Sequence, residues 1–278
     1  PGDKNTVYVV PDSFYKQSRI YTMNVKNEPA VIEDELVLMK GGNTVDYDLE
    51  GIALRESGGY WLVSEGRITN PAPRDRNLLI KVASDGTVLQ EIRLPADVEA
   101  LQIRFGFEGV AVTGSGDDEK VYVAFQREWS GDPAQRVRIG EYTPLTDEWR
   151  FFYYPLDAVE SPNGGWVGLS ELTYLGYDRF AVIERDNQGG PNARVKRIYV
   201  FSIAGVTPVA QGGAFPVLTK YLKQDVLPDL QSYNGWVLDK LEGLAITRDG
   251  EAYAVTDNDG VDDHGGETRL LRLGKDLH

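Results

Sequence analysis

The sequence has no cysteine and only two histidines among its 278 residues. Without cysteine, the chain cannot contain a disulfide, a thiol nucleophile, a cysteine–zinc site or an iron–sulfur cluster. Because His264 and His278 are the only histidines, a metal site built from several histidines is also excluded. Hydrolytic chemistry that needs a cysteine nucleophile or several histidine ligands is therefore ruled out.

Basic residues are also in deficit, with 29 Lys+Arg against 43 Asp+Glu and a formal net charge of −14. This balance argues against binding to the phosphate backbone of nucleic acids and favours cation binding or solubility. The sequence has no run of 18 apolar residues, so we expect no membrane span, and it shows no signal-peptide pattern. It begins with Pro1 rather than Met, so we expect a processed chain or a fragment of a longer protein.

Four segments of the sequence resemble one another. They are DLEGIAL at 48–54, GFEGVAV at 106–112, GLSELTY at 168–174 and KLEGLAI at 240–246. Their alignment matches one glutamate in each segment, at intervals of 58, 63 and 71 residues: Glu50, Glu108, Glu171 and Glu242. The third segment departs from the Glu-Gly pattern of the others, because it reads Ser170-Glu171-Leu172.

Strand-like runs follow each of these segments. Each segment leads through a turn into a second run that is rich in Val, Tyr and Phe, and then into further runs of the same kind. Such short apolar runs between turns predict β-strands. The second run of each unit ends in a polar residue: Glu65, Gln126, Glu184 and Asp257. Four short strands per unit, repeated about every 60 residues, predict a β-propeller.

The units at the two ends are incomplete. The run TVYVVPDS at 6–13 matches a second strand, which aligns Asp12 with Glu65, and the last unit has no fourth strand. The stretch 216–230 is predicted to carry a short amphipathic helix. We therefore predict an all-β fold: a single β-propeller domain over residues 1–278, with five or six four-stranded blades of which the first and last are incomplete. An upstream segment or a second chain is expected to complete the ring.

The repeated polar residues are expected to meet at one mouth of the central channel. Hairpin geometry brings the start of each first strand and the end of each second strand to the same edge of a blade. Carboxylates that share a site repel one another, and Ca²⁺, or less favourably Mg²⁺, would offset that repulsion with oxygen ligands. In the alternative, each glutamate only caps neighbouring backbone amides, within or beside its own blade. The predicted ligands are Asp12, Glu50, Glu65, Glu108, Glu171, Glu242, Asp257, Asn258 and Asp259.

Two polar turns stand apart from the repeat. The run Glu184-Arg185-Asp186 combines carboxylates with an arginine, which suits the recognition of phosphate beside a metal. The turn at 257–260 is rich in oxygen ligands, but its spacing does not fit an EF-hand loop. Arg127 and Lys240 lie beside repeat positions and are candidates for anion binding. The predicted catalytic residues are Glu184, Arg185, Asp186, Lys240 and Arg127.

The ordered set of motifs resembles a known family. DLEGIAL with YWLVSEG, GFEGVAV with VYVAFQRE, WVGLSEL with VIERDNQ, and KLEGLAI with VTDNDG are similar to the phytase-like domain family, often described by an esterase-like activity of phytase. The resemblance covers residues 7–274. It implies a β-propeller, a periplasmic or extracellular bacterial protein, and calcium-dependent hydrolysis of phosphoesters.

Two hypotheses about function follow. In the first, the chain is a calcium-dependent phosphoester hydrolase that acts on a small phosphorylated substrate at the acidic mouth of the channel. Attack by a metal-activated water needs neither cysteine nor histidine, which matches the composition. In the second, the chain is a non-catalytic propeller that binds a ligand or a protein, since a fold does not fix a function.

Overall fold

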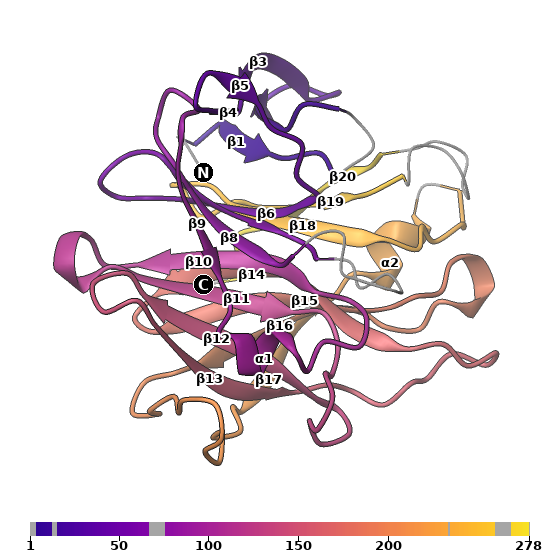
Figure 1. Ribbon diagram of the computed structural model, residues 1–278. Helices are drawn as coiled ribbons and strands as arrows, with labels where there is room; N and C mark the ends of the chain where they lie inside the picture. Colours follow the sequence, from indigo (N-terminus) through magenta and orange to yellow (C-terminus); the bar gives the residue numbers. More distant parts are fainter. Residues whose placement is uncertain (1–3, 13–15, 67–75, 233, 259–267, 278) are drawn as a thin grey trace.

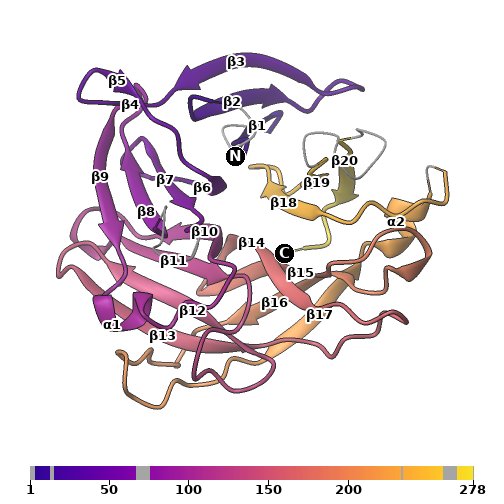
Figure 2. The same ribbon diagram turned by 45° about the vertical axis from the view of Figure 1, so that its right-hand side comes forward.

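Five antiparallel sheets are arranged as blades around a central axis and form a five-bladed β-propeller (Figure 1 and Figure 2). The computed structural model describes residues 4–12, 16–66, 76–232, 234–258 and 268–277. It confirms the all-β propeller predicted from the sequence and gives five as the number of blades. Among the helices of these residues, none is long and apolar enough to cross a membrane.

The three middle blades have four strands each, and the first strand of each lies nearest the axis (Figure 2). Blade 2 consists of β6 (Leu49–Leu54), β7 (Tyr60–Ser64), β8 (Leu78–Val82) and β9 (Val88–Arg93). Blade 3 consists of β10 (Phe107–Thr113), β11 (Lys120–Phe125), β12 (Arg136–Thr143) and β13 (Glu148–Pro155). Blade 4 consists of β14 (Val167–Gly176), β15 (Arg179–Asp186), β16 (Lys196–Ser202) and β17 (Lys220–Asp225).

The first and last blades have three described strands each, as predicted. Blade 1 consists of β1 (Thr6–Val9), β2 (Arg19–Asn24) and β3 (Val31–Val37), and blade 5 of β18 (Leu241–Ile246), β19 (Ala252–Thr256) and β20 (Leu270–Gly274). A small hairpin of β4 (Met39–Lys40) and β5 (Asn43–Thr44) joins blades 1 and 2. The short helices are α1 (Ala96–Glu99), η1 (Gly116–Asp118), η2 (Gly190–Asn192) and α2 (Leu227–Gln231). The stretch 216–230 thus forms the fourth strand of blade 4 and most of α2, where the sequence predicted a helix alone.

Burial follows the position of a strand within its blade. The middle strand β15 is buried at seven of its eight residues, because neighbouring blades cover both of its faces. Strands of this kind read as continuous apolar runs. The outermost strand β17 is mostly exposed, and its sequence KYLKQD is correspondingly polar.

Apolar side chains fill the interfaces between neighbouring blades. Separate clusters pack blade 2 against blade 3, blade 3 against blade 4, and blade 4 against blade 5. Blade 1 packs against blade 2 through a smaller cluster that includes Ile20 and Leu49. Among the described residues, the interface that closes the ring, between blades 5 and 1, has the smallest cluster, with Val7, Val25 and Tyr253 buried. Since buried apolar area is the main stabilising contribution, the described residues stabilise this interface least.

The inner strands of blades 2 to 5 pack side by side along the axis. β6 packs against β10, β10 against β14, and β14 against β18. Three of them also pack on the second strand of the preceding blade: β10 on β7, β14 on β11 and β18 on β15. This arrangement brings the starts of the four inner strands together at one mouth of the channel.

Candidate functional site

A β-bulge interrupts the inner strand at the repeated motif. In blade 2 the pairing passes from Leu49 to Gly51, which leaves Glu50 as the extra residue. The same step leaves Glu108 unpaired in blade 3 and Glu242 unpaired in blade 5. A bulge re-aims a side chain without ending the strand. The chain therefore sets one glutamate apart from the ladder in each of these three blades.

Blade 4 carries a serine at the equivalent bulge. Its pairing passes from Leu169 to Glu171, so Ser170 is the extra residue. The predicted equivalence of Glu171 with the other glutamates is therefore wrong by one position, because Glu171 occupies the place of the following glycine. The Ser170 hydroxyl donates a hydrogen bond to the Leu241 carbonyl oxygen at 2.7 Å and ties blade 4 to blade 5.

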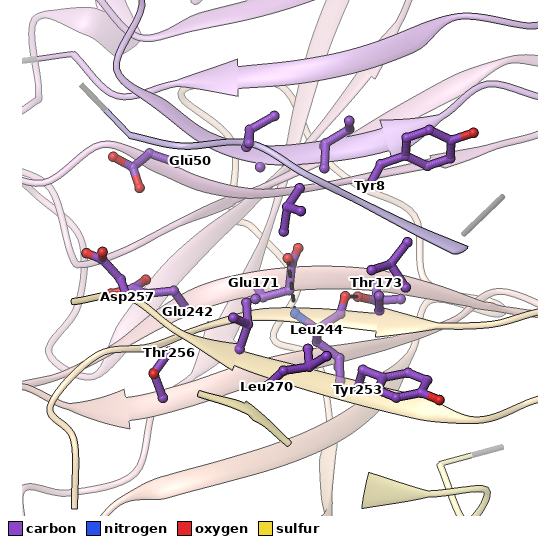
Figure 3. Close-up of a pocket in the computed structure, with 18 of the residues that line it drawn as sticks. Tyr8, Glu50, Glu171, Thr173, Glu242, Leu244, Tyr253, Thr256, Asp257 and Leu270 are labelled. Atoms are coloured by element: carbon purple, nitrogen blue, oxygen red, sulfur yellow. Dashed lines mark hydrogen bonds between the residues drawn. The ribbon is translucent and has the colours of Figure 1, made fainter. Parts of the chain in front are cut away.

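Glu171 lies further along the channel than the bulge glutamates (Figure 3). Its carboxylate accepts hydrogen bonds from the Leu172 amide at 2.7 Å and from the Leu244 amide at 3.4 Å. Burial raises the pKa of Glu171 to about 8, and the two amide donors only partly offset the effect. This glutamate thus performs the backbone capping that the alternative interpretation of the repeat expects.

The same one-residue correction applies to the second strand of blade 4. In blade 2 the Glu65 amide donates a hydrogen bond to the Asp48 carbonyl oxygen. In blade 5 the Asp257 amide donates the equivalent bond to the Lys240 carbonyl oxygen. In blade 4 the equivalent pair is Gly168 with Arg185. Arg185, rather than Glu184, therefore occupies the position of Glu65, Gln126 and Asp257.

Glu184 and Asp186 lie on the other face of β15, away from the channel. The Glu184 carboxylate accepts hydrogen bonds from the Tyr154 hydroxyl at 2.8 Å and the Lys220 ammonium at 2.6 Å. The Asp186 carboxylate accepts one from the buried Lys196 ammonium at 2.8 Å. Both acids are fully buried in these networks, and neither lines the channel. We therefore assign them to the packing of the blade and leave them out of the candidate site.

A cavity of ≈ 1370 Å³ occupies the channel. Figure 3 shows its two ends: Glu50, Glu242 and Asp257 lie at one, and Tyr8 and Tyr253 at the other. The polar end coincides with the starts of the inner strands, as the repeat predicted. The candidate site is therefore an acidic mouth that leads into a more apolar channel.

The carboxylates gather most closely in blade 2. One oxygen each of Asp48, Glu50 and Glu65 can be chosen so that all three lie within 4.8 Å of one another. Burial and the nearby carboxylates of Glu108 and Glu65 raise the pKa of Glu50 well above its ordinary value. Burial and Glu242 do the same to the pKa of Glu108. Bulge glutamates of three blades therefore interact across the channel.

Glu65 also positions the neighbouring blade. One of its oxygens accepts a hydrogen bond from the Gly106 amide, at 2.7 Å, immediately before β10 begins. A second anchor comes from Asn77, whose side-chain oxygen accepts the amides of Gly66 and Phe107 at 3.0 Å. The start of blade 3 is thus held against the acidic cluster of blade 2.

Arg185 is the cation at the centre of the mouth. Its side chain is 4% exposed, and its guanidinium pairs with the Glu242 carboxylate and lies 3.9 Å from Asp239. Burial lowers the pKa of Arg185, but Glu242 and Asp239 raise it above its ordinary value, so the charge persists. The Nε atom of Arg185 and the Oδ1 atom of Asp239 are buried without a hydrogen-bond partner. Such unsatisfied buried groups are rare, and a bound ion, an ordered water or a catalytic role is the usual explanation.

The other predicted site residues have different fates. Asp12, Gln126, Asp257 and Asn258 line the cavity, whereas Asp259 lies outside the described residues. Lys240 lines it too, and its ammonium lies 3.2 Å from the Asp257 carboxylate. Arg127 is not part of the lining, and its guanidinium pairs with Glu128 at 3.2 Å.

A stack of rings and guanidinium groups forms the rim beside the acidic cluster. The rings of Phe105 and Trp166 lie 4.9 Å apart, with Arg104 over Phe105 at 4.6 Å and Arg127 over Trp166 at 5.1 Å. Phe105 has a positive φ of 59°, which is uncommon for an aromatic residue. The Trp129 indole fixes this backbone by donating to the Phe105 carbonyl oxygen at 2.8 Å.

Sequence reasoning missed several residues of the mouth. Asp48 precedes Glu50 by two positions within the DLEG motif, so its place in the repeat was a usable signal. Asp239 directly precedes Lys240 and the repeated segment of blade 5, which was a similar signal. Trp166 and Phe105 lie in the loops that enter β14 and β10, outside any repeated pattern. Their place beside the acidic cluster becomes visible only once the blades are assembled.

Fold and site together define a β-propeller with a mixed acidic and cationic site at one mouth of its channel. The family model for Phytase-like, esterase-like activity of phytase, matches residues 1–260, so the chain belongs to this family. Among solved structures, the chain is similar to the GH32 beta-fructofuranosidase BmSUC1 of Bombyx mori, solved as a mutant in complex with sucrose, at 12% identity and a TM-score of 0.41. That match covers 91% of this chain and 52% of the other, so the chain spans about half of its length. Among curated proteins, none matches the sequence.

Proposed function

We propose that the chain is a calcium-dependent phosphoester hydrolase that works at the acidic mouth of the propeller. One observation carries this proposal. The buried Arg185 guanidinium, with its unsatisfied Nε, lies beside carboxylates that two other blades supply, Glu108 from blade 3 and Glu242 from blade 5. A phosphate group suits both the carboxylates and the arginine, because it can bind a metal held by carboxylates and accept hydrogen bonds from an arginine.

The residues of blade 2 fit a calcium ion. Ca²⁺ prefers carboxylate oxygens at roughly 2.3–2.6 Å, so two oxygens on one ion lie at most about 5 Å apart. The oxygens of Asp48, Glu50 and Glu65 lie within 4.8 Å of one another, which satisfies this limit. No described residue donates a hydrogen bond to the Glu50 carboxylate, whose pKa is raised. These three residues would hold the ion, and a bound ion would polarise the phosphoryl group and lower the pKa of a water.

The remaining groups have roles that follow from their charge and place. Arg185 would bind a phosphate oxygen and stabilise the negative charge that develops during hydrolysis. Lys240 flanks it and would favour the approach of an anion to a protein of net negative charge. Glu108, whose pKa is raised, holds a proton more readily than an ordinary carboxyl and would pass it to the leaving oxygen.

A substrate panel tests this proposal. Phosphomonoester, phosphodiester and carboxylester substrates are each assayed with Ca²⁺, with Mg²⁺ and with excess chelator, after elemental analysis of the purified protein. We expect phosphoester turnover that Ca²⁺ supports and chelator removes. The Glu50→Gln variant should lose it, whereas Glu148→Gln, at an exposed outer-strand carboxylate paired with Arg150, should not. No turnover of any substrate at any metal concentration would refute the proposal.

The same panel separates the rival function. A non-catalytic propeller would bind phosphate or a phosphorylated ligand at Arg185 without converting it. Calorimetric binding of a phosphomonoester, with no product over many hours at saturating Ca²⁺, would favour that function. The capping role of Glu171 fits either function, because it uses backbone amides of blades 4 and 5.

A further inference from the structure

The innermost strand of blade 1 has a free edge. β1 pairs with β2, and no other described strand pairs with it. In blades 2 to 5, by contrast, the second strand lies between an inner strand and a third strand. The sequence matches β1 to those second strands, so the inner position of blade 1 is not filled by the described residues.

The backbone groups on this edge can be identified. The Val25 amide donates to the Asn5 carbonyl oxygen at 2.8 Å, so these opposite residues form a hydrogen-bonded pair. Such pairs alternate along an antiparallel ladder, and β1 and β2 pair without a bulge. The amides and carbonyls of Thr6 and Tyr8, and by the same alternation those of Val10 just after β1, therefore point away from β2. Tyr8 and Val10 line the cavity.

A strand at the inner position of blade 1 would extend the row of inner strands that the other blades form around the axis. The inner strands pack in the order β6, β10, β14 and β18, and the last three also pack on the second strand of the blade before them. A strand on the free edge of β1 would lie between β18 and β6 and cover β19. The side chains that border this position are apolar: Val7, Ile52, Ala245, Tyr253 and Leu270.

The size of the cavity agrees with an added strand. Ligand sites for small molecules usually have volumes of roughly 300–1,000 Å³. The cavity here has ≈ 1370 Å³ and extends from the acidic mouth along β1 from Val7 to Val9. The proposed hydrolysis uses only the acidic mouth, so the apolar part of the cavity beside β1 has no role in it.

We propose that the free edge of β1 binds an extended polypeptide segment as an added antiparallel strand. The expected sequence pattern of this segment is that of the inner strands of blades 2, 3 and 5: apolar, Glu, Gly, apolar, Ala, apolar. Backbone hydrogen bonds to Thr6, Tyr8 and Val10 provide affinity, and the alternating apolar side chains provide register, as in other cases of strand addition. This inference does not depend on the proposed hydrolysis.

A synthetic peptide tests the inference directly. A fluorescent peptide with the sequence of residues 48–54, DLEGIAL, is titrated with the 278-residue chain, and a scrambled peptide of the same composition serves as control. We expect saturable binding of the first and at least tenfold weaker binding of the second. Amide hydrogen exchange should slow at Thr6, Tyr8 and Val10, and not at Val7 and Val9, which already donate to β2.

A matched pair of variants separates the backbone from the side chain. Tyr8→Pro removes an amide that points away from β2, so the β1–β2 ladder is kept, and proline is tolerated at such an edge position. Tyr8→Ala removes the ring and keeps the amide. The peptide should bind at least tenfold more weakly to the proline variant and within about threefold to the alanine variant. Equal binding of both peptides to the unmodified chain, or slower exchange at Val7 and Val9 instead, would overturn the inference without any variant.

Discussion

Blades 2 and 4 fill the same three backbone positions with side chains of opposite net charge. Blade 2 places Asp48, Glu50 and Glu65 there. Blade 4 places Gly168, Ser170 and Arg185 at the equivalent positions of its ladder. The mouth of the channel is therefore polarised, with a carboxylate side and a guanidinium side.

This difference explains how so acidic a site is tolerated. A complete set of carboxylates would raise each pKa further by mutual repulsion and destabilise the fold near neutral pH. Arg185 opposes that repulsion, since it lowers the pKa of both Glu242 and Glu108 relative to the effect of burial alone. A repeat that looks uniform in sequence thus produces an asymmetric site. The four predictions below test that asymmetry.

Removing the guanidinium should have the largest effect. We expect Arg185→Met to lower phosphoester kcat/KM by roughly 10²–10³-fold, the usual loss for a group that stabilises transition-state charge. Arg197→Met is the matched control, because Arg197 pairs with Asp157 and Glu160 on the outside of the blade. Steady-state kinetics measure both. A loss of less than threefold in Arg185→Met would remove Arg185 from the site.

Removing one carboxylate of blade 2 should act mainly on the metal. We expect Glu50→Gln to weaken Ca²⁺ binding by at least about tenfold, as measured by isothermal titration calorimetry. Glu171→Gln is the control, because backbone amides already bind the Glu171 carboxylate. Equal losses in the two variants would mean that the bulge glutamates hold no special place in metal binding.

The pH dependence of stability should reveal the carboxylate side without any mutation. Folding raises the pKa of Glu171 from an ordinary 4.5 to about 8, and it also raises the pKa values of Glu50 and Glu108. The folded state binds these protons more tightly, so each group contributes stability at low pH that is lost as pH rises. For Glu171 this contribution is complete below about pH 4.5 and is lost as pH rises through about 8.

In chelator, the Tm should therefore fall by a few degrees between pH 5.5 and pH 8, since about 1 kcal/mol shifts the Tm of a large domain by roughly 2–4 °C. Ca²⁺ should reduce the fall, because it binds the ionised carboxylates of the folded state. Differential scanning calorimetry measures both curves. A Tm that rises over this range in chelator would contradict the assignment of raised pKa values.

The smallest effect should come from the bulge residue of blade 4. Ser170→Ala removes a buried hydrogen bond to Leu241, so we expect about 1 kcal/mol less stability in urea unfolding. Activity and Ca²⁺ affinity should stay within about twofold, because Ser170 carries no charge. A large loss of activity would show that the bulge of blade 4 serves the chemistry as well.

The sequence predicted the blades and half of the mouth. Its repeat period and apolar runs identified the propeller, and Glu50, Glu108 and Glu242 lie at the mouth as expected. Blade 4 was misaligned by one residue because Glu171 matched the glutamates by chemistry, although its backbone position is that of a glycine. Bulges and ladder register decide such equivalences, and one sequence does not display them. The rim formed by Phe105 and Trp166 depends on how two blades meet, which no local pattern encodes.

Glycines that follow the bulge residues set the spacing of the inner strands. A Cβ atom on Gly51 would lie 2.8 Å from the Glu108 carbonyl oxygen, and one on Gly109 would lie 2.3 Å from the Leu172 nitrogen. Close backbone contacts between neighbouring inner strands therefore set the diameter of the mouth. Substitutions in the blade interfaces can accumulate over evolutionary time and alter stability while the distances between the carboxylates stay the same. Each blade can also change the charge that it presents by a single codon, independently of the others, so the ring is a scaffold on which a family can vary its chemistry one blade at a time.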